Sequence, residues 1–222
     1  MKKIGLITIG QSPRDDVTID LLPIFGDDIE LLQAGALDGL TAKDIAAFAP
    51  QEDDYVLISK LKDGSSVVFA EKHILPKLQQ CIFDLEEKGV ELIMFLCTGK
   101  FPEFKSNVPL IFPCEVLNGA VPALTSRSSI AVVTPKPEQE AQCIGKWQSY
   151  VKSVQVVSAS PYGSPQEIDT AAVKLSAMDV DIVVLDCIGY TSAMKERVSR
   201  LSGKRVVLSR TIAARVVMEL LA

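Results

Sequence analysis

Two cysteines stand at corresponding places in the chain, each after a short apolar run. Residues 92–96 lead directly to Cys97, and residues 182–185 lead through Asp186 to Cys187. A short continuous apolar run is typical of a strand that is buried on both faces of a parallel sheet. Residues just past the C-terminal end of such a strand lie where open α/β sheets bind ligands. We therefore expect Cys97 and Cys187 to be a pair of acid/base groups at one site.

A pair of thiols could transfer protons at a weakly acidic carbon. The hydrogen on the carbon next to a carboxylate is removed only if a base is present and the enolate-like anion is stabilised. The hydroxyls of Thr98 and Thr191 and backbone N–H groups at a helix N-terminus could stabilise that anion. The same donors favour the thiolate. Because two neighbouring thiolates repel each other, one cysteine should be the thiolate and the other the thiol. The predicted chemistry is racemisation or isomerisation without a cofactor.

The loop after the first predicted strand offers several groups that could bind a carboxylate. Arg14 could hold it through two parallel hydrogen bonds, although an ion pair with Asp15 or Asp16 is an equally good interpretation. The loop lacks the glycines of a dinucleotide-binding fingerprint or a P-loop. The substrate-binding candidates from this loop are Thr8, Gln11, Ser12 and Arg14.

Further candidates lie beside the two cysteines or at the end of the strand that opens the second half. Thr134 could donate to a substrate carboxylate, but it could equally be a helix N-cap. Tyr190 could line the site or donate a hydrogen bond. The complete set of these candidates is Thr98, Gly99, Thr134, Gly189, Tyr190 and Thr191.

The other three cysteines have less distinctive surroundings. Cys81 and Cys143 are expected on helices, where a free cysteine usually behaves as a small buried hydrophobic residue. Cys114 follows a predicted strand and could belong either to the core or to the site. A single histidine, His73, is too few for a usual zinc site, and we expect it to be a partly exposed turn residue. We therefore expect no metal and no cofactor.

The chain repeats the same order of predicted elements twice. Residues 4–8 and 130–134 are apolar strands that end at a threonine and lead into a helix. After its cysteine strand, each half has another short apolar strand, at residues 108–112 and 205–208, and then a helical segment. Alternating strands and helices predict an α/β fold whose sheets are mainly parallel and flanked by helices.

We place the two pseudo-repeated halves at residues 1–126 and 127–222, with a polar hinge at residues 126–129. The first half carries an insertion near residues 55–70, in which Asp63 and Gly64 separate two β-rich runs. An Asp-Gly pair in this position is a strong signal for a β-hairpin. We expect the hairpin to act as a lid or as a contact between subunits of a homo-oligomer.

Local signals also mark the helices. Thr41 and Asp44 resemble a capping box at a helix start. Pro76 suits the first turn of a helix that runs to about residue 88, with Gly89 beyond its end. Pro165 suits the first turn of another helix.

Composition excludes several classes of function. The net charge is −5 and there is no cluster of basic residues, which argues against nucleic-acid binding. No segment reaches the roughly 18 apolar residues that a membrane span needs. Five cysteines are too few and odd in number for a disulfide framework. We expect a soluble cytoplasmic protein whose partner is a small carboxylate.

The paired cysteine strands, each followed by threonine or glycine in a pseudo-repeated α/β half, resemble the aspartate/glutamate racemase superfamily. Residues 4–16, IGLITIGQSPRDD, together with the LKDG segment at residues 61–64, resemble more specifically the AroM family. The superfamily resemblance implies a racemase-like fold with a cleft between the halves, Cys97 and Cys187 on its two sides, and carboxylate donors near Thr98 and after Thr8 and Thr134. The AroM resemblance covers essentially the whole chain.

The residues after the cysteines differ from those of amino-acid racemases, which usually have Asn-Thr after the first cysteine and Thr-His after the second. Here Thr98-Gly99 and Ile188-Gly189 occupy these places. The expected function is therefore a cofactor-independent racemase, isomerase or lyase that acts on a small carboxylate. One alternative is a binding or regulatory protein without catalysis. Another makes one cysteine a nucleophile.

Overall fold

The computed structural model describes residues 1–125 and 129–221. It divides into two compact units, one formed by residues 1–113 with the end of the last helix from Val217 onward, and one formed by residues 114–216. Most of the expected hinge, residues 126–128, lies outside the described residues. The boundary at residues 126/127 therefore stays a prediction.

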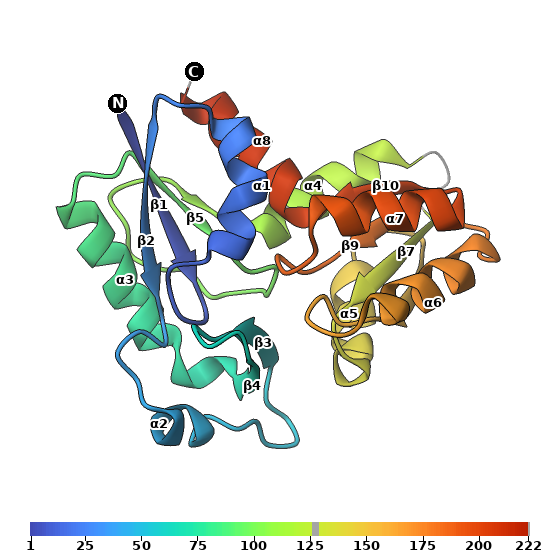
Figure 1. Cartoon of the computed structure of the whole chain (residues 1–222), viewed down its shortest axis with the longest axis horizontal. Coiled ribbons are helices and arrows are strands. Elements are labelled where there is room, and N and C mark those ends of the chain that lie inside the picture. Colours follow the sequence, from blue (N-terminus) through green and yellow to red (C-terminus); the bar gives the residue numbers. More distant parts are fainter. Residues whose placement is uncertain (126–128, 222) are drawn as a thin grey trace. The chain divides into compact units, whose positions relative to one another are not determined.

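The first unit contains a four-stranded parallel sheet (Figure 1). The strand order is β2-β1-β5-β6. Because β1 and β5 are the two central strands, the chain segments that follow them leave the same edge of the sheet next to each other. The strands are β1 (Lys2–Thr8), β2 (Ile29–Gly35), β5 (Leu92–Phe95) and β6 (Leu110–Ile111), and the helices of this unit are α1 (Asp15–Phe25), α2 (Ala42–Ala46), the 3-10 turn η1 (Glu71–His73) and α3 (Leu75–Glu87).

The second unit repeats this topology. Its parallel sheet has the order β10-β9-β7-β8, so in both units the first and third strands along the chain form the centre and the fourth strand flanks the third. The strands are β7 (Ser129–Thr134), β8 (Ser153–Ser158), β9 (Ile182–Leu185) and β10 (Arg205–Leu208). The helices are α4 (Pro113–Leu124), the 3-10 turn η2 (Pro137–Gln139), α5 (Glu140–Trp147), α6 (Pro165–Ser176), α7 (Ser192–Ser202) and α8 (Ser209–Leu221). The predicted α/β fold with two pseudo-repeated halves is confirmed.

The repeat extends to single hydrogen bonds at the ends of the central strands. The amide of Leu96 donates to the carbonyl of Ile7 (2.7 Å), and the amide of Asp186 donates to the carbonyl of Val133 (3.0 Å). Leu96 and Asp186 are therefore equivalent positions. The residue that follows is a cysteine in both units.

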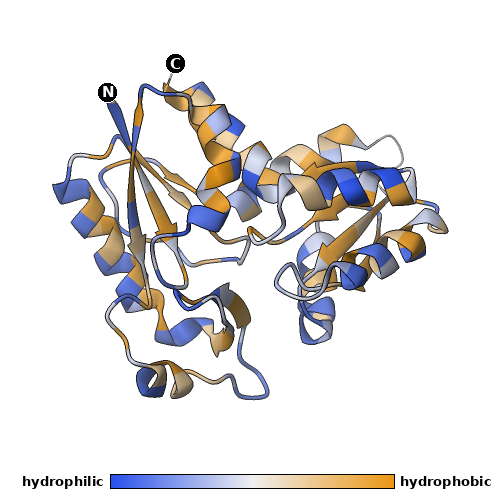
Figure 2. Cartoon of the chain, viewed as in Figure 1, coloured by the Kyte–Doolittle hydropathy of each residue, from blue (hydrophilic) through white to orange (hydrophobic). Residues whose placement is uncertain are grey.

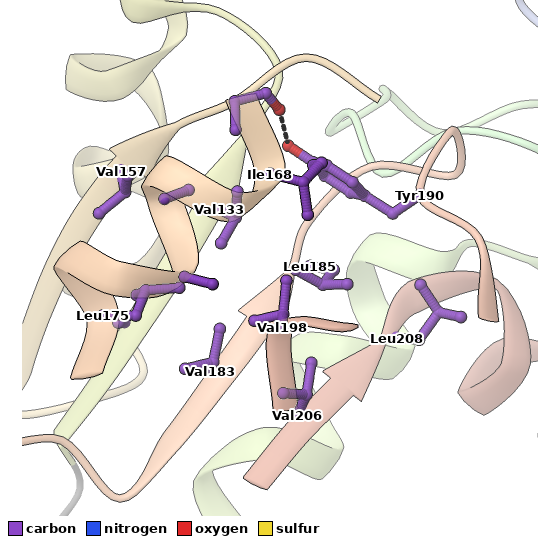
Figure 3. Packing of buried hydrophobic residues seen from close by; sticks show 14 of the residues in the cluster. Val133, Val157, Ile168, Leu175, Val183, Leu185, Tyr190, Val198, Val206 and Leu208 are labelled. Atoms are coloured by element: carbon purple, nitrogen blue, oxygen red, sulfur yellow. Dashed lines mark hydrogen bonds between the residues drawn. The ribbon is translucent and has the colours of Figure 1, made fainter. Parts of the chain in front are cut away.

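Burial on both faces explains why the central strands are uniformly apolar. Successive side chains of a strand point to opposite faces. In the second unit, Val183 and Leu185 pack toward α6 and α7 (Figure 3), whereas Ile182 and Val184 join a separate cluster with residues of α4 and α5. A parallel strand covered by helices on both sides must be apolar along its whole length.

Hydropathy follows the same arrangement. Strands β5 and β9 contain only apolar residues, while the helices carry both apolar and polar residues (Figure 2). Among the helices of residues 1–125 and 129–221, none combines the length and apolar character that a membrane span requires.

The predicted hairpin is confirmed. Strands β3 (Val56–Lys60) and β4 (Ser66–Ala70) pair antiparallel, with Leu57 opposite Phe69. Gly64 in the connecting turn has a φ of 86°, a conformation that residues with a Cβ rarely adopt. The Asp-Gly signal therefore identified both the turn and its strands.

The helix signals are confirmed as well. Thr41 and Asp44 form a reciprocal capping box at the start of α2. Gly89 follows α3 with a φ of 78°, and Pro165 is the first residue of α6. His73 ends the 3-10 turn before α3, is partly exposed as expected, and stacks on Phe48 with ring centroids 5.1 Å apart.

We predict that Phe95→Ala destabilises the first unit by about 3–5 kcal/mol, because it leaves a large cavity in the core. Phe95 is fully buried, and its ring lies 4.5 Å from that of Phe112 and 5.6 Å from that of Phe101, measured between centroids. Urea unfolding measures the loss. Val173→Ala on α6 is the control, since Val173 is 63% exposed and its replacement should change the unfolding free energy by no more than about 0.5 kcal/mol. Equal effects of the two substitutions would contradict this packing.

Candidate active site

Cys97 lies in a tight turn two residues after the end of β5. Its sulfur accepts a hydrogen bond from the backbone N–H of Gly99 at 3.2 Å, and the residue is partly exposed. A Cβ on Gly99 would lie 2.9 Å from Leu57 Cδ2 and 3.3 Å from the Cys97 sulfur. A side chain at residue 99 would therefore crowd the turn against the hairpin.

Cys187 lies in the equivalent turn after β9. Its sulfur accepts a hydrogen bond from the N–H of Gly189 at 3.3 Å, and Cys187 is 9% exposed. A Cβ on Gly189 would lie 2.6 Å from the hydroxyl oxygen of Tyr162 and 2.8 Å from Cγ of Pro161. A side chain at residue 189 would therefore force Tyr162 or Pro161 to move.

Both units thus contain the same cysteine turn, in which the sulfur accepts an amide hydrogen bond from the glycine two residues later. We call these the Cys97 turn (residues 97–99) and the Cys187 turn (residues 187–189). A hydrogen bond donated to the charged form of a group favours that form. Each turn therefore helps to stabilise a thiolate.

Buried side chains hold the backbone of the Cys187 turn. The hydroxyl of Ser209 donates to the carbonyl of Cys187 at 2.9 Å. The fully buried guanidinium of Arg210 donates to the carbonyl of Ile188 through Nε at 2.9 Å and also through Nη2. These two residues begin α8, and their contribution was not predicted from the sequence.

Arg14 is paired with Asp16. Its Nε and Nη2 donate to the two oxygens of the Asp16 carboxylate at 2.8 and 2.9 Å, and the residue is only 3% exposed. Its Nη1 lies 3.5 Å from the hydroxyls of Thr8 and Ser59. Of the two interpretations of Arg14, the structure contains the ion pair, and its partner is Asp16.

Gln11 and Ser12 tie their loop to neighbouring segments. The Gln11 side-chain oxygen accepts from the amide of Lys62 at 2.9 Å. The amide of Ser12 donates to Asp38 at 2.8 Å, and its hydroxyl donates to the same carboxylate at 2.5 Å. The hairpin also packs against this loop, since a Cβ on Gly10 would lie 2.7 Å from the Lys60 carbonyl oxygen. These contacts give Gln11 and Ser12 a structural role.

The threonine candidates are mostly buried at strand ends. Thr8, Thr98 and Thr134 are 1%, 8% and 4% exposed. Thr134 ends β7, and the N-caps of the following 3-10 turn and helix are Lys136 and Gln139, so the alternative of Thr134 as an N-cap is wrong.

Thr191 is the N-cap of α7. Its hydroxyl accepts from the amide of Met194 at 3.2 Å. It also lines a pocket of about 560 Å³ between α6 and α7, together with Ile168, Met194 and Arg200. Ser164, another lining residue, caps α6. Two of the hydroxyls around this pocket are thus already engaged in capping.

Tyr190 is a core residue. It is fully buried, and its hydroxyl donates to the carbonyl of Ala159 at 2.6 Å (Figure 3). Burial raises the pKa of this phenol well above its ordinary value. In this conformation the side chain offers no surface to a ligand, which corrects the expectation that Tyr190 lines the site.

The remaining cysteines are buried. Cys81 lies on α3 and Cys143 on α5, as expected, and burial raises the pKa of their thiols to about 11 and about 12. Cys114 is 1% exposed at the start of α4, and burial raises its pKa too. Cys114 therefore belongs to the core of the second unit. Within residues 1–125 and 129–221, no group of three or more His, Cys, Asp or Glu side chains is placed to hold a metal ion.

Two tyrosines next to the cysteine turns were missed by the sequence analysis. Tyr55 accepts a hydrogen bond from the amide of Lys100 at 3.1 Å, one residue after the Cys97 turn. Tyr162 lies against Gly189 in the Cys187 turn. Both are partly exposed. For Tyr162 the sequence did contain one signal: the residue follows strand β8 and so lies at the C-terminal edge of its sheet.

Comparison with solved structures defines the fold class. The chain is similar to an arylmalonate decarboxylase mutant in liganded form (TM-score 0.64, 14% identity, covering 99% of this chain and 92% of the other). It is also similar to Picrophilus torridus aspartate racemase (0.58, 13%, 99% and 94%) and to a mutant of Nocardia farcinica maleate cis-trans isomerase with a covalently bound succinylcysteine intermediate (0.64, 15%, 99% and 92%). The protein therefore has the aspartate/glutamate racemase fold.

The family follows from the sequence itself. Residues 4–221 match the AroM protein family, so the chain belongs to it. No curated protein matches the chain by sequence. The resemblance to AroM proteins expected from residues 4–16 and 61–64 is thus confirmed.

We predict that Gly189→Ala lowers the free energy of unfolding by about 1–3 kcal/mol, because the new methyl group must displace Tyr162 or Pro161. Thermal or urea unfolding measures the change. Gly119→Ala on α4 is the matched control, because no atom lies within 4 Å of its added Cβ. There the substitution should be neutral or stabilising, since alanine is the better helix former. Equal losses at both positions would contradict the packing of the Cys187 turn.

Proposed function

We propose that this AroM-family protein is a cofactor-independent racemase, isomerase or lyase that acts at the α-carbon of a small carboxylate, with Cys97 and Cys187 as its acid/base pair. The observation that carries the proposal is the repeated turn, in which each sulfur accepts the amide of the glycine two residues later. The two cysteine turns occupy equivalent positions in the two units. A reaction that needs one proton-transfer group on each face of a carbon would use such a duplicated element.

The proposed steps balance as simple proton transfers. One cysteine, as the thiolate, removes the α-proton and becomes a thiol. The other cysteine, a thiol at the start, delivers its proton to the opposite face of the carbon and becomes a thiolate. In a lyase, loss of carbon dioxide leaves the same kind of carbanion, which one thiol then protonates. The amide of Gly99 or Gly189 donates a hydrogen bond that lowers the free energy of forming the thiolate on its cysteine.

The substrate carboxylate would be bound by groups near the strand ends. We propose Thr8, Thr98 and Thr134 for this role, because the amides of Gly99 and Gly189 already donate to the cysteine sulfurs. Arg14 would contribute only if the substrate carboxylate replaced that of Asp16, because Nε and Nη2 of the Arg14 guanidinium already donate to the Asp16 carboxylate. The buried hydroxyls would then stabilise the enolate-like anion in the way an oxyanion hole does.

The similar structures support this reaction class through their fold, which is used by a racemase, a decarboxylase and an isomerase. The Nocardia isomerase mutant carries a covalent succinylcysteine intermediate. This favours, as a second candidate, a reaction in which one cysteine of the pair is a nucleophile. The third candidate is a protein that binds a small carboxylate without turnover.

We predict that Cys97→Ser and Cys187→Ser each abolish inversion and reduce solvent exchange at the α-carbon of the substrate, because inversion needs a proton-transfer group on each face and serine is a far weaker acid than cysteine. The protein is incubated in heavy water with a panel of α-amino, α-hydroxy and α-aryl carboxylates and substituted malonates. Loss of the α-proton signal, or deuterium incorporation after decarboxylation, is followed by NMR. Cys81→Ala is the matched control and should retain exchange, since Cys81 is a helix residue with a raised thiol pKa.

Exchange that persists unchanged in both serine variants would overturn the two-cysteine mechanism. A trapped adduct on one cysteine, seen by intact-mass spectrometry, would identify the nucleophilic alternative. If the wild type shows no exchange with any compound, but a carboxylate raises the melting temperature of both serine variants, the binding protein is the correct interpretation.

A further inference from the structure

The pocket between α6 and α7 is a feature that the proposed mechanism does not use. Its volume of about 560 Å³ falls in the range of small-molecule sites, roughly 300–1,000 Å³. The residues that line it lie between residues 160 and 200, inside the second unit. Neither Cys97 nor Cys187 is among the described residues that line it. The pocket is therefore a candidate binding site separate from the two cysteines.

Part of the pocket wall is continuous with the core of the second unit. Ile168 is 2% exposed, and Met194 packs against the same core cluster, which also contains Tyr190 (Figure 3). Pro165 and Ala193, from the first turns of α6 and α7, also line the pocket. A ligand with an apolar body would remove this surface from water, which favours binding.

Two hydroxyls in the pocket keep a hydrogen to donate. The Ser160 hydroxyl accepts from the amide of Tyr162 at 3.2 Å, and the Thr191 hydroxyl accepts from the amide of Met194 at 3.2 Å. Within the part of the chain that the structure describes, neither hydroxyl donates to another group. A hydroxyl is a donor as well as an acceptor. These two residues therefore favour a ligand that carries hydrogen-bond acceptors.

The charged side chains of the pocket come from α7. Arg197 is already paired, because its Nε and Nη2 both donate to the Asp169 carboxylate on α6. Arg200 attracts Asp169 and helps to lower its pKa, but within residues 1–125 and 129–221 its guanidinium forms no hydrogen bond or ion pair. Among the lining residues that the structure describes, Glu196 is the one carboxylate against two guanidinium groups. The pocket thus combines apolar surface with a guanidinium that can bind an anion.

We propose that this pocket binds a small organic anion with an apolar body, such as an aryl- or alkyl-substituted carboxylate. The apolar body packs on Ile168 and Met194, and the anionic group pairs with Arg200. The hydroxyls of Ser160 and Thr191 donate to acceptor atoms of the ligand. The site goes beyond the function proposed above, because binding here needs neither cysteine and no turnover.

The methionines allow binding to be located by NMR. The chain contains five of them, of which Met194 lines the pocket and Met94 is fully buried in β5 of the other unit. In protein labelled with [methyl-13C]methionine, 2-naphthylacetate should shift the Met194 signal in a saturable way and leave the Met94 signal unchanged. The variant Met194→Leu assigns the signal. A Met194 signal that does not respond would overturn the proposal.

We predict that 2-naphthylacetate binds about three- to fivefold more tightly than the isosteric 2-naphthylacetamide, the size expected for one exposed ion pair. Arg200→Gln should remove this preference, and Arg200→Lys should keep most of it because the cation stays. Arg205→Gln is the matched control, since Arg205 is exposed on β10 and does not line the pocket. Dissociation constants come from the Met194 titration.

The substitution Ala193→Trp tests the cavity itself. The indole would occupy the pocket and should prevent the ligand-induced shift, whereas Val173→Trp places the same ring on the exposed face of α6 and should leave binding unchanged. Wild-type binding by Ala193→Trp, equal binding of the amide and the acid, or equal losses in Arg205→Gln and Arg200→Gln would each overturn the proposal. Tighter binding of 2-(2-naphthyl)ethylamine would also overturn it, and would assign recognition to Glu196.

Binding is measured without turnover, so this test is independent of the proposed function. Saturable binding together with absent α-carbon exchange would refute the enzyme and keep the pocket. Absent binding together with exchange that depends on both cysteines would do the reverse.

Discussion

Burial of β5 and β9 on both faces is the constraint on which the rest of this structure depends. A strand covered by helices on both sides can carry only apolar residues, and polar chemistry can begin only where the strand ends. In each unit the chain reaches that end beside the opening strand, with an amide hydrogen bond from Leu96 or Asp186 to its carbonyl. The cysteine is the next residue in both cases. The position of the sulfur is therefore set by the core rather than by the loops around it.

Much of the fold was predictable because its signals are local. The apolar strands, the Asp-Gly hairpin, the capping box at Thr41 and the glycine after α3 each depend on a few neighbouring residues. The repeated order of elements then led to the repeated sheet. The boundary near residue 126 could not be resolved in the same way, since a polar stretch indicates a connection without indicating which unit the neighbouring helix packs against.

The site was predicted less completely, because its details depend on contacts between distant segments. The sequence located both cysteines at strand ends and the glycines that follow them. It could not reveal that Tyr190 is fixed to Ala159, or that Tyr162 packs on Gly189, since both contacts join loops from different βα units. Likewise, Asp186 is adjacent to Cys187 in sequence, but Lys146 reaches it from a helix 40 residues earlier. Arg14 was the exception, because its partner Asp16 lies within its own turn.

The hydroxyl of Tyr190 has a consequence for how the second unit can respond to a ligand. Its bond to the carbonyl of Ala159 links the segment after β9 to the segment after β8, and Tyr162 and Gly189 extend this link on the partly exposed side. These contacts join the two loops to each other. A ligand that displaced one loop would have to break the hydrogen bond between Tyr190 and Ala159 or move the other loop with it, and the second of these loops begins at Cys187.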